Sequence, residues 1–359
     1  MTNDALNVSR RSFLQCAAAG AAAAAGYAAT AAEQAGTPPK LPDSEWSQIR
    51  GFNYQPSYGS SGFELWQKFD AKVIEAELTQ GKKFFPKINC LRWWQSWDSY
   101  LRDPKRYATN FETTLTLADK AGCRVVPCLF NRWHDATLDY GGIYIDHFWP
   151  QASWVQTPTM FDGYLRDIVG GHKDDPRIAA WDLCNEPYSY SCARESIPAI
   201  VQSETAWLKL MHDRCKENGA KAPITVGIHP GVPLEMVDPI CDLLSIHPYF
   251  VHNAPQASRE AYEQSLDRDV AFALKVNKPL LSTECCWGAT DDKVRVESVR
   301  YTLTQLKRRN IGWLVYLLHH SLIADAHRAE FGPLSGPGNL AFIEADGTLR
   351  PGHEVFNEF

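Results

Sequence analysis

The sequence lacks the marks of several large protein classes. It has no block of basic residues of the kind that binds nucleic acid and no acidic tail, and its net charge of −6 is mild. No GxGxxG motif follows an early apolar run, which argues against a nucleotide-binding doubly wound sheet. No repeat of solenoid period is visible. We therefore expect a globular protein that does not bind nucleic acid.

The ten cysteines include no CxxC pair, which argues against the common zinc and redox motifs. Cys285 and Cys286 are adjacent, so a bridge between them would be strained. Cys90, Cys123, Cys128 and Cys184 lie in or beside apolar runs, which favours buried free thiols. A pairing of Cys192 with Cys215 stays open. No metal site and no cofactor is predicted.

No apolar run reaches the length that confidently predicts a membrane span. The N-terminus instead carries Arg10-Arg11, apolar residues, an alanine-rich stretch and the small residues Ala29-Thr30-Ala31. This order is typical of a twin-arginine export signal followed by a cleavage site. We expect a signal peptide over residues 1–31, a linker over 32–46, and an exported protein, periplasmic or extracellular, without stable membrane insertion after cleavage.

Residues 47–359 alternate short apolar runs with longer amphipathic stretches. Several runs are almost continuously apolar, as expected for parallel strands covered on both faces. The strands are expected at 49–54, 88–93, 124–130, 178–183, 224–228, 243–246, 279–283 and 311–317. Helices are expected at 64–80, 108–121, 161–170, 197–218, 258–276 and 292–309. The alternation predicts an α/β protein, a single-domain (β/α)8 TIM barrel.

Two glutamates stand at the ends of apolar runs. Glu186 follows the run that ends in Asn185 and precedes Pro187, which lacks an N–H and stops strand pairing. Glu284 ends the run that begins at Pro279, 98 residues further on. Because a barrel unit averages ~31 residues, the two glutamates are expected at the ends of strands four and seven. Those ends face each other across the barrel mouth, where barrel enzymes place catalytic groups.

The residues around these glutamates resemble a known family. Asn185-Glu186-Pro187 resembles the acid/base motif of the clan A glycoside hydrolases, most of all glycoside hydrolase family 5. Arg92 resembles the arginine of strand two, His247-Pro248-Tyr249 the His-x-Tyr of strand six, and Thr283-Glu284 the nucleophile of strand seven. The C-terminal stretch 338–348 is similar to the closing segment of the family.

The resemblance implies a retaining glycosidase that acts on a carbohydrate, with Glu186 as acid/base and Glu284 as nucleophile. It would cleave β-glycosidic bonds of a glucan- or mannan-like poly- or oligosaccharide by double displacement. Such enzymes hold their two carboxyl groups ~5–5.5 Å apart. Arg92 and Tyr249 would hydrogen-bond Glu284 and favour its charged form.

Further residues are implied as substrate contacts. Asn185 would hold the sugar 2-hydroxyl, and His247 would orient Glu186 or the sugar. Among the 12 tryptophans, Trp133 and Trp287 are expected to line sugar subsites.

At two strand ends the chain departs from the family pattern. Tyr316 stands on strand eight, where the family has a tryptophan. At the end of strand three either Asn131 or His134 could take the place of the family's histidine. Both departures leave the sugar specificity open.

Two other function classes compete with a glycosidase. A non-catalytic carbohydrate-binding barrel should lack one of the two glutamates. A metal-dependent hydrolase could use the loop after strand eight, which carries several residue types that bind metal. These residues are His319, His320, Asp325, His327 and Glu330.

Overall fold

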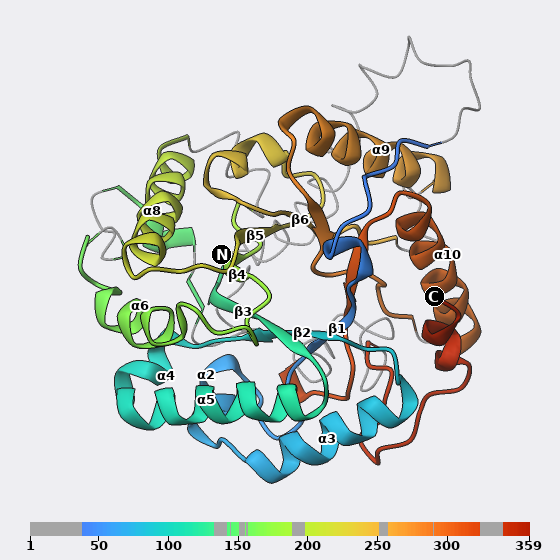
Figure 1. Ribbon diagram of the computed structural model, residues 1–359, viewed down its shortest axis with the longest axis horizontal. Coiled ribbons are helices and arrows are strands. Elements are labelled where there is room, and N and C mark those ends of the chain that lie inside the picture. The colour runs from blue at the N-terminus through green and yellow to red at the C-terminus, as the bar shows by residue number, and fades with distance from the viewer. Residues whose placement is uncertain are drawn as a thin grey trace, which may run out of the picture.

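The computed structural model describes residues 38–132, 142–143, 145–150, 155, 157–188, 198–250, 258–289, 291–323 and 340–359. It is a closed barrel of eight parallel strands, in which each strand pairs with the next and the last pairs with the first (Figure 1). The strands are β1 (Arg50–Tyr54), β2 (Cys90–Trp94), β3 (Arg124–Asn131), β4 (Trp181–Asn185), β5 (Ile224–Ile228), β6 (Leu244–Ile246), β7 (Leu280–Ser282) and β8 (Gly312–Val315). The predicted (β/α)8 barrel is confirmed.

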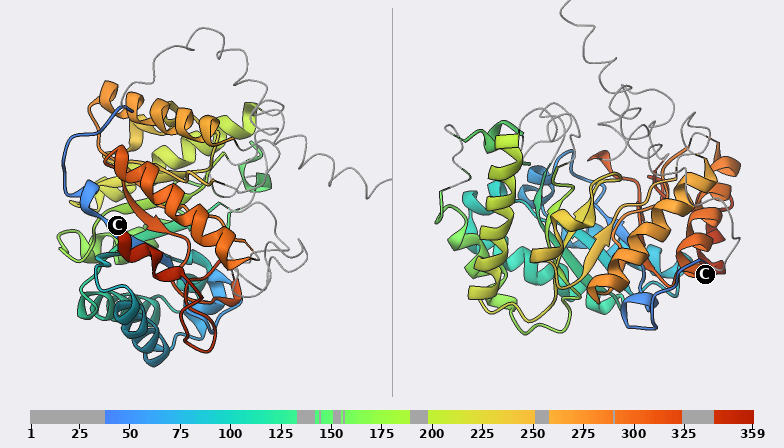
Figure 2. Two further views of the ribbon diagram at one scale, coloured as in Figure 1. Left: turned by 90° about the vertical axis from the view of Figure 1, so that its right-hand side faces the viewer. Right: turned by 90° about the horizontal axis from the view of Figure 1, so that it is seen from above.

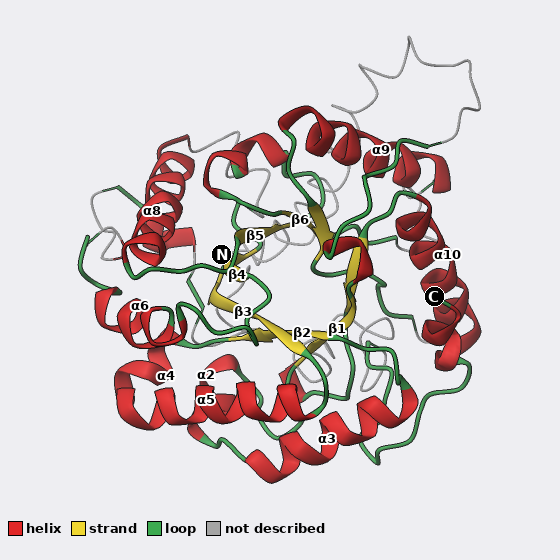
Figure 3. Cartoon of the chain, in the orientation of Figure 1, coloured by secondary structure: helices red, strands yellow, loops and turns green. Residues whose placement is uncertain are grey.

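Helices surround the strand ring on the outside, as Figure 3 shows by secondary structure. They are α2 (Gly62–Gln67), α3 (Ala71–Phe84), α4 (Trp97–Arg102), α5 (Pro104–Lys120), α6 (Asp162–Ile168), α8 (Pro198–Glu217), α9 (Arg259–Val276) and α10 (Asp292–Arg308). The side views in Figure 2 show α8 on one flank of the barrel and α9 with α10 on the opposite flank. The strands are buried on both faces, which explains their continuous apolar sequences.

Short helices complete the architecture. They are 3-10 turns at Trp46–Gln48 (η2), Ile145–Phe148 (η3), Gly170–His172 (η5), Leu234–Met236 (η6), Asp238–Ile240 (η7) and His353–Glu358 (η9). The turn η2 lies against the start of β8. A Cβ on Gly312 would come within 2.0 Å of the Trp46 carbonyl oxygen, so only glycine allows this approach.

The chain before the barrel is described from residue 38. Leu41 is buried there, and its N–H donates to the Arg309 carbonyl at 3.0 Å. The predicted signal peptide, 1–31, lies outside the described residues and stays a prediction. Within the described residues, no helix combines the length and the apolar character needed to cross a membrane.

The described cysteines confirm the prediction of buried free thiols. All eight described cysteines are buried and free, and they include Cys215, Cys285 and Cys286. The thiols of Cys285 and Cys286 lie 3.7 Å apart. Cys192 lies outside the described residues.

Candidate active site

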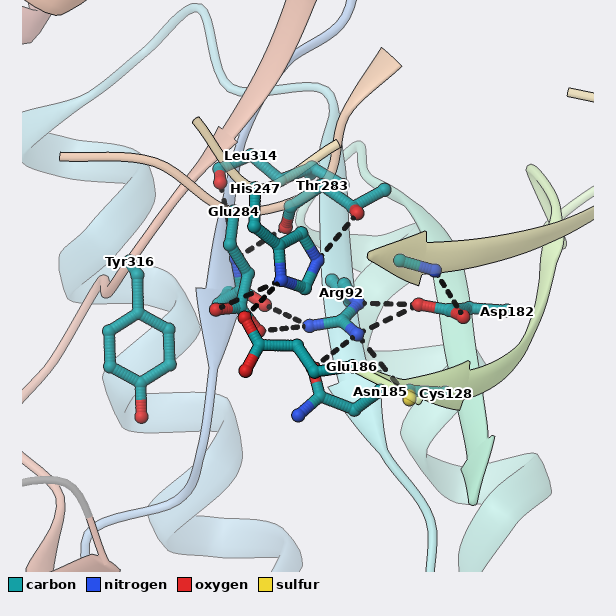
Figure 4. A network of polar contacts seen from close by, with 12 residues as sticks. Arg92, Cys128, Asp182, Asn185, Glu186, His247, Thr283, Glu284, Leu314 and Tyr316 are labelled. Carbon is teal, nitrogen blue, oxygen red and sulfur yellow. Dashed lines mark hydrogen bonds and ion pairs between the residues drawn. The ribbon is translucent and has the colours of Figure 1, made fainter. Parts of the chain in front are cut away.

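The two glutamates lie at the carboxyl ends of opposite strands, as predicted. Glu186 directly follows β4, and Glu284 lies two residues after β7. Both are nearly buried, with exposed fractions of 6% and 5%. Their side chains converge in the barrel mouth (Figure 4). One carboxylate oxygen of each lies within 4.8 Å of the other, together with a ring nitrogen of His247.

The Glu186 turn has an unusual backbone. The φ angle of Glu186 is 47°, a left-handed conformation that costs free energy for a residue with a side chain. The Glu186 N–H donates to the Gly227 carbonyl of β5 at 2.8 Å, so the neighbouring strand holds this conformation. The turn directs the carboxylate toward Glu284 rather than along the strand.

Arg92 of β2 binds the nucleophile candidate. Its Nη1 lies 2.5 Å from Glu284 Oε1, and its Nη2 donates to Asn185 Oδ1 at 2.9 Å. The guanidinium is fully buried. Burial lowers the Arg92 pKa, but Cys128, Asp182 and Glu284 beside it raise the pKa by more, so the cation is retained. This charge lies directly against the Glu284 carboxylate.

Asp182 and Asn53 hydrogen-bond Arg92, and neither was predicted from the sequence. Asp182 of β4 accepts from Arg92 Nε at 2.8 Å and from the Gly227 N–H at 3.2 Å. Asn53 of β1 accepts from Arg92 Nη1 at 3.1 Å and donates to the carbonyl of Thr283. Both are polar residues at inward-facing positions of apolar strands. That pattern is the feature of the sequence that could have predicted them.

His247 connects the acid/base candidate to the barrel wall. Its Nδ1 lies 2.8 Å from Glu186 Oε1, and its Nε2 lies 3.0 Å from Thr283 Oγ1. The same Nδ1 is 3.7 Å from Glu284 Oε2. The ring therefore contacts Glu186 directly, and whether it orients Glu186 or the sugar stays a prediction. A Cβ on Gly227 would come within 2.5 Å of Nε2, so the ring needs a glycine at that position.

Tyr249 supplies the second bond to the nucleophile candidate. Its hydroxyl donates to Glu284 Oε2 at 2.6 Å. Burial raises the pKa of Tyr249 well above its usual range, and Glu284 and Glu186 raise it further, so the hydroxyl keeps its proton. Trp287 packs edge-on against Tyr249 with ring centroids 5.2 Å apart, and it is partly exposed. Both residues thus lie at the mouth.

Tyr316 takes the predicted place on strand eight. It follows β8 directly and stands beside the two glutamates in Figure 4. Its ring centroid is 6.4 Å from that of Trp94, and its hydroxyl lies 3.5 Å from Gln55 Oε1. Trp313, three residues before Tyr316, packs under the Arg50 guanidinium. The central carbon of that group lies 3.7 Å from the centroid of the Trp313 ring.

At the end of β3, Asn131 occupies the position for which two candidates were considered. Its Oδ1 accepts from Asn185 Nδ2 at 3.1 Å, so it contacts the group expected to hold the sugar. Trp133 and the alternative candidate His134 lie outside the described residues. Their roles stay predictions.

Comparisons with known proteins find glycoside hydrolases. No family model matches the chain. Probable mannan endo-1,4-β-mannosidase C of Aspergillus terreus is 26% identical over 142 residues, which are 36% of this chain and 34% of that protein. Mannan endo-1,4-β-mannosidase F of Aspergillus clavatus is 29% identical over 106 residues, or 28% and 23%. The match thus spans about 34% of the first relative and 23% of the second.

Solved structures match the fold over most of the chain. GH5_18 from Streptomyces cattleya in complex with GlcNAc superposes with a TM-score of 0.64 at 16% identity, over 86% of this chain and 78% of that one. The exo-β-1,4-mannosidase from Opitutaceae bacterium strain TAV5 gives 0.63 at 22% identity, over 86% and 58%. The chain resembles the glycoside hydrolases of family 5. At these identities the structural matches show the shared fold.

A cavity of about 860 Å³ opens beside this family-5-like site, which is within the size range of small-molecule pockets. Asn131 lines it and connects it to Asn185. Its other walls include Trp97, Asp98 and His147. Burial raises the pKa of Asp98, and the neighbouring Arg102 and His147 side chains oppose this shift.

Two groups of described residues have the geometry to hold a metal ion. Glu186, His247 and Glu284 form one. The other is Glu112, His172 and Asp175, but Arg177 already bonds both of its carboxylates.

The loop after β8 was the site predicted by the metal-dependent alternative. His319 Nδ1 lies 3.0 Å from the carbonyl of His320 and 3.9 Å from Glu77 Oε1, and neither histidine belongs to a metal-capable group of the described residues. Asp325, His327 and Glu330 lie outside those residues.

Proposed function

We propose that the chain is a retaining glycosidase that cleaves β-mannosidic bonds of an oligo- or polysaccharide. The observation that carries the proposal is the approach of the Glu186 and Glu284 carboxylates to within 4.8 Å. Retaining enzymes hold these groups ~5–5.5 Å apart and inverting enzymes ~6.5–9.5 Å apart. The mannanase names of the sequence relatives favour mannose over glucose.

The unequal surroundings of the two carboxylates assign their roles. Glu284 receives bonds from the Arg92 cation and the Tyr249 hydroxyl, which stabilise an anion. Glu186 has neither of these donors and contacts His247. We assign Glu284 as the nucleophile and Glu186 as the acid/base.

The reaction then proceeds in two displacements. Glu284 attacks the anomeric carbon while the glycosidic bond breaks and Glu186 gives its proton to the leaving oxygen. In the second step Glu186 takes a proton from water, whose oxygen attacks the same carbon and releases Glu284. Asn185, fixed by Arg92 and Asn131, would bond the 2-hydroxyl. Tyr316 and Trp287 offer aromatic faces to sugar rings.

The test is hydrolysis of β-1,4-manno-oligosaccharides, with cello-oligosaccharides as the glucose comparison. We expect cleavage of the mannan series with the β-anomer as first product, read by NMR. Glu284→Ala should lose turnover, and azide should rescue it to an α-mannosyl azide. Glu186→Ala with an activated substrate should instead give the β-azide.

Four results would contradict parts of this assignment. An inverted first product would exclude the double displacement. Activity that persists in Glu284→Ala would exclude the nucleophile. Activity that chelator abolishes and Glu284→Gln retains would favour the metal-dependent alternative, and binding of manno-oligosaccharides without any turnover would favour a non-catalytic barrel.

We further propose that the protein is exported through the twin-arginine signal of residues 1–31. Such signals depend on the arginine pair. Replacing Arg10 and Arg11 by lysine should leave the full-length chain in the cytoplasm, whereas the natural sequence should yield a shortened protein outside it. Fractionation and N-terminal sequencing measure this, and equal export of both forms would exclude the signal.

A further inference from the structure

Glu204 of α8 is a buried carboxylate that the proposed mechanism does not use. It lies on the helix that follows the catalytic turn, with an exposed fraction of 2%. Its Oε1 accepts from Arg132 Nε at 2.9 Å and from the Tyr188 N–H at 3.3 Å. Burial raises the pKa of Glu204, and Arg132 and the Tyr188 amide oppose that shift.

The two donors belong to the loops that leave neighbouring strands. Arg132 directly follows β3, and its N–H donates to the Asn185 carbonyl at 3.1 Å. Tyr188 lies two residues after Glu186, and its hydroxyl lies 2.9 Å from Thr205 Oγ1 of α8. One oxygen atom of Glu204 thus ties the turn that carries Glu186 to both β3 and α8.

This turn needs such a restraint because its backbone is strained. Glu186 and Tyr188 have φ angles of 47° and 60°, in the left-handed region that residues with side chains rarely adopt. Such conformations persist only where the surroundings fix them. The Gly227 carbonyl fixes the Glu186 end of the turn, and Glu204 fixes the Tyr188 end.

We propose that Glu204 is a positioning residue, which holds the Glu186 carboxyl at the distance from the leaving oxygen that proton transfer requires. The inference rests on the proposed function. It concerns only Glu186, because Glu284 lies on the opposite strand and its bonds to Arg92 and Tyr249 do not involve Glu204.

The chemistry of the leaving group separates positioning from general stability. A phenoxide leaving group needs the Glu186 proton, whereas 2,4-dinitrophenolate leaves without one. We expect Glu204→Gln to lower kcat/KM for phenyl β-mannoside by about 100-fold, the scale of a misplacement near 1 Å. The value for 2,4-dinitrophenyl β-mannoside should stay close to that of the unaltered protein.

Asp267→Asn is the matched control. Asp267 also bonds an arginine, Arg309 at 2.7 Å, but on α9, away from the mouth. Asp267→Asn should change kcat/KM little, and by the same factor for both substrates. If Glu204→Gln does not fold, as judged by circular dichroism, Glu204→Asp keeps the charge and withdraws the carboxylate, and it should show the same selective loss at smaller size.

The outcomes are distinct. A loss confined to the phenyl substrate supports the proposal. Equal losses on both substrates, or no loss on either, overturn it while leaving the proposed function intact. An unaltered protein that cleaves neither these mannosides nor β-1,4-manno-oligosaccharides overturns the proposed function instead.

Discussion

Arg92 connects more of the candidate site than any other single residue considered above. Its three nitrogen atoms contact Glu284, Asn185, Asp182, Asn53 and Cys128. A planar guanidinium can serve several acceptors in fixed directions, which an ammonium group cannot. Arg92 therefore fixes the nucleophile candidate and the Asn185 amide, which we propose bonds the sugar, with one rigid group.

Loss of Arg92 should destabilise the protein. Arg92→Met leaves Asp182 fully buried without a cation, and breaking a buried pair in this way costs about 3–5 kcal/mol. Urea unfolding measures the change. Arg300→Met is the control because its partner Glu358 is half exposed, and it should cost less than about 1 kcal/mol. If both variants lose the same free energy of unfolding, the buried Asp182 does not need the Arg92 cation.

Tyr249→Phe should lower activity without unfolding the barrel. The change removes only the hydroxyl that donates to Glu284, and it keeps the ring that packs on Trp287. A bond to a charged group is worth about 1.5–3 kcal/mol, so kcat/KM on manno-oligosaccharides should fall roughly 10- to 100-fold. Tyr301→Phe, which loses a bond to Glu263 on the outer helices, should leave kcat/KM unchanged. Similar effects of both variants would refute the role.

Some of these residues could be predicted from sequence and others could not. Glu186 and Glu284 follow apolar strands, and barrel enzymes place catalytic groups at the carboxyl ends of their strands, so both were expected at the mouth. Asp182 and Asn53 lie inside strands, and their contacts depend on the register that pairs Asn53 with Arg92 and Asp182 with Cys128. A single sequence does not reveal register, so these two supports were missed.

At the scale of elements, strand and helix order was predictable and several boundaries were not. The expected helix over 64–80 is two helices, α2 and α3, because Asp70 caps a new helix start at Ala71. The helix expected from 108 begins at Pro104, which Asp103 caps. Asp291 and Asp292 were both candidates for the cap of the helix expected from 292, and the side chain of Asp291 caps α10.

The fourth strand begins later than expected. Ile178 forms only an isolated bridge to Val125, and β4 runs from Trp181 to Asn185. Its pairing with β5 shifts in register between Asp182 and Asn185. This irregularity lies directly before Glu186, where the chain must turn the carboxylate into the mouth, and no periodicity in the sequence signals it.

The packing of β5 against His247 gives a prediction at the element scale. Gly227→Ala puts a Cβ 2.5 Å from the His247 ring, which is buried and cannot yield freely. The ring should move off Glu186, and kcat/KM should fall at least about 10-fold, as expected for a misplaced catalytic group. Gly171→Ala is the control, because nothing lies within 4 Å of its added carbon. Full activity of Gly227→Ala would show that the ring position does not matter.

At the scale of the whole molecule, Asp269 of α9 should make stability depend on pH. It lines a cavity of about 500 Å³ between α9 and the loops after β5 and β6. Burial raises its pKa from 3.8 to about 7, while Arg268 lowers and Glu235 raises it by less. The folded state therefore keeps a proton that the unfolded chain releases near pH ~4, and this contribution is lost as the pH rises through 7.

Asp269→Asn should remove that dependence. An amide resembles the protonated acid, so the fall in unfolding free energy between pH 5 and pH 8 should become smaller. Urea titrations at both pH values measure it. Glu260→Gln changes an exposed carboxylate on the same helix and should leave the slope unchanged. If the pH dependence of the unfolding free energy is the same in Asp269→Asn, Asp269 does not keep its proton in the folded state.

The pairing of β1 with β8 has a consequence for the order of synthesis. Gly51 pairs with Leu314, so the ring of strands cannot close until the final strand has left the ribosome. A nascent chain already contains both glutamates before that moment, yet it has no completed mouth to hold them. An unfinished chain therefore lacks the arrangement of the two glutamates on which the proposed cleavage depends.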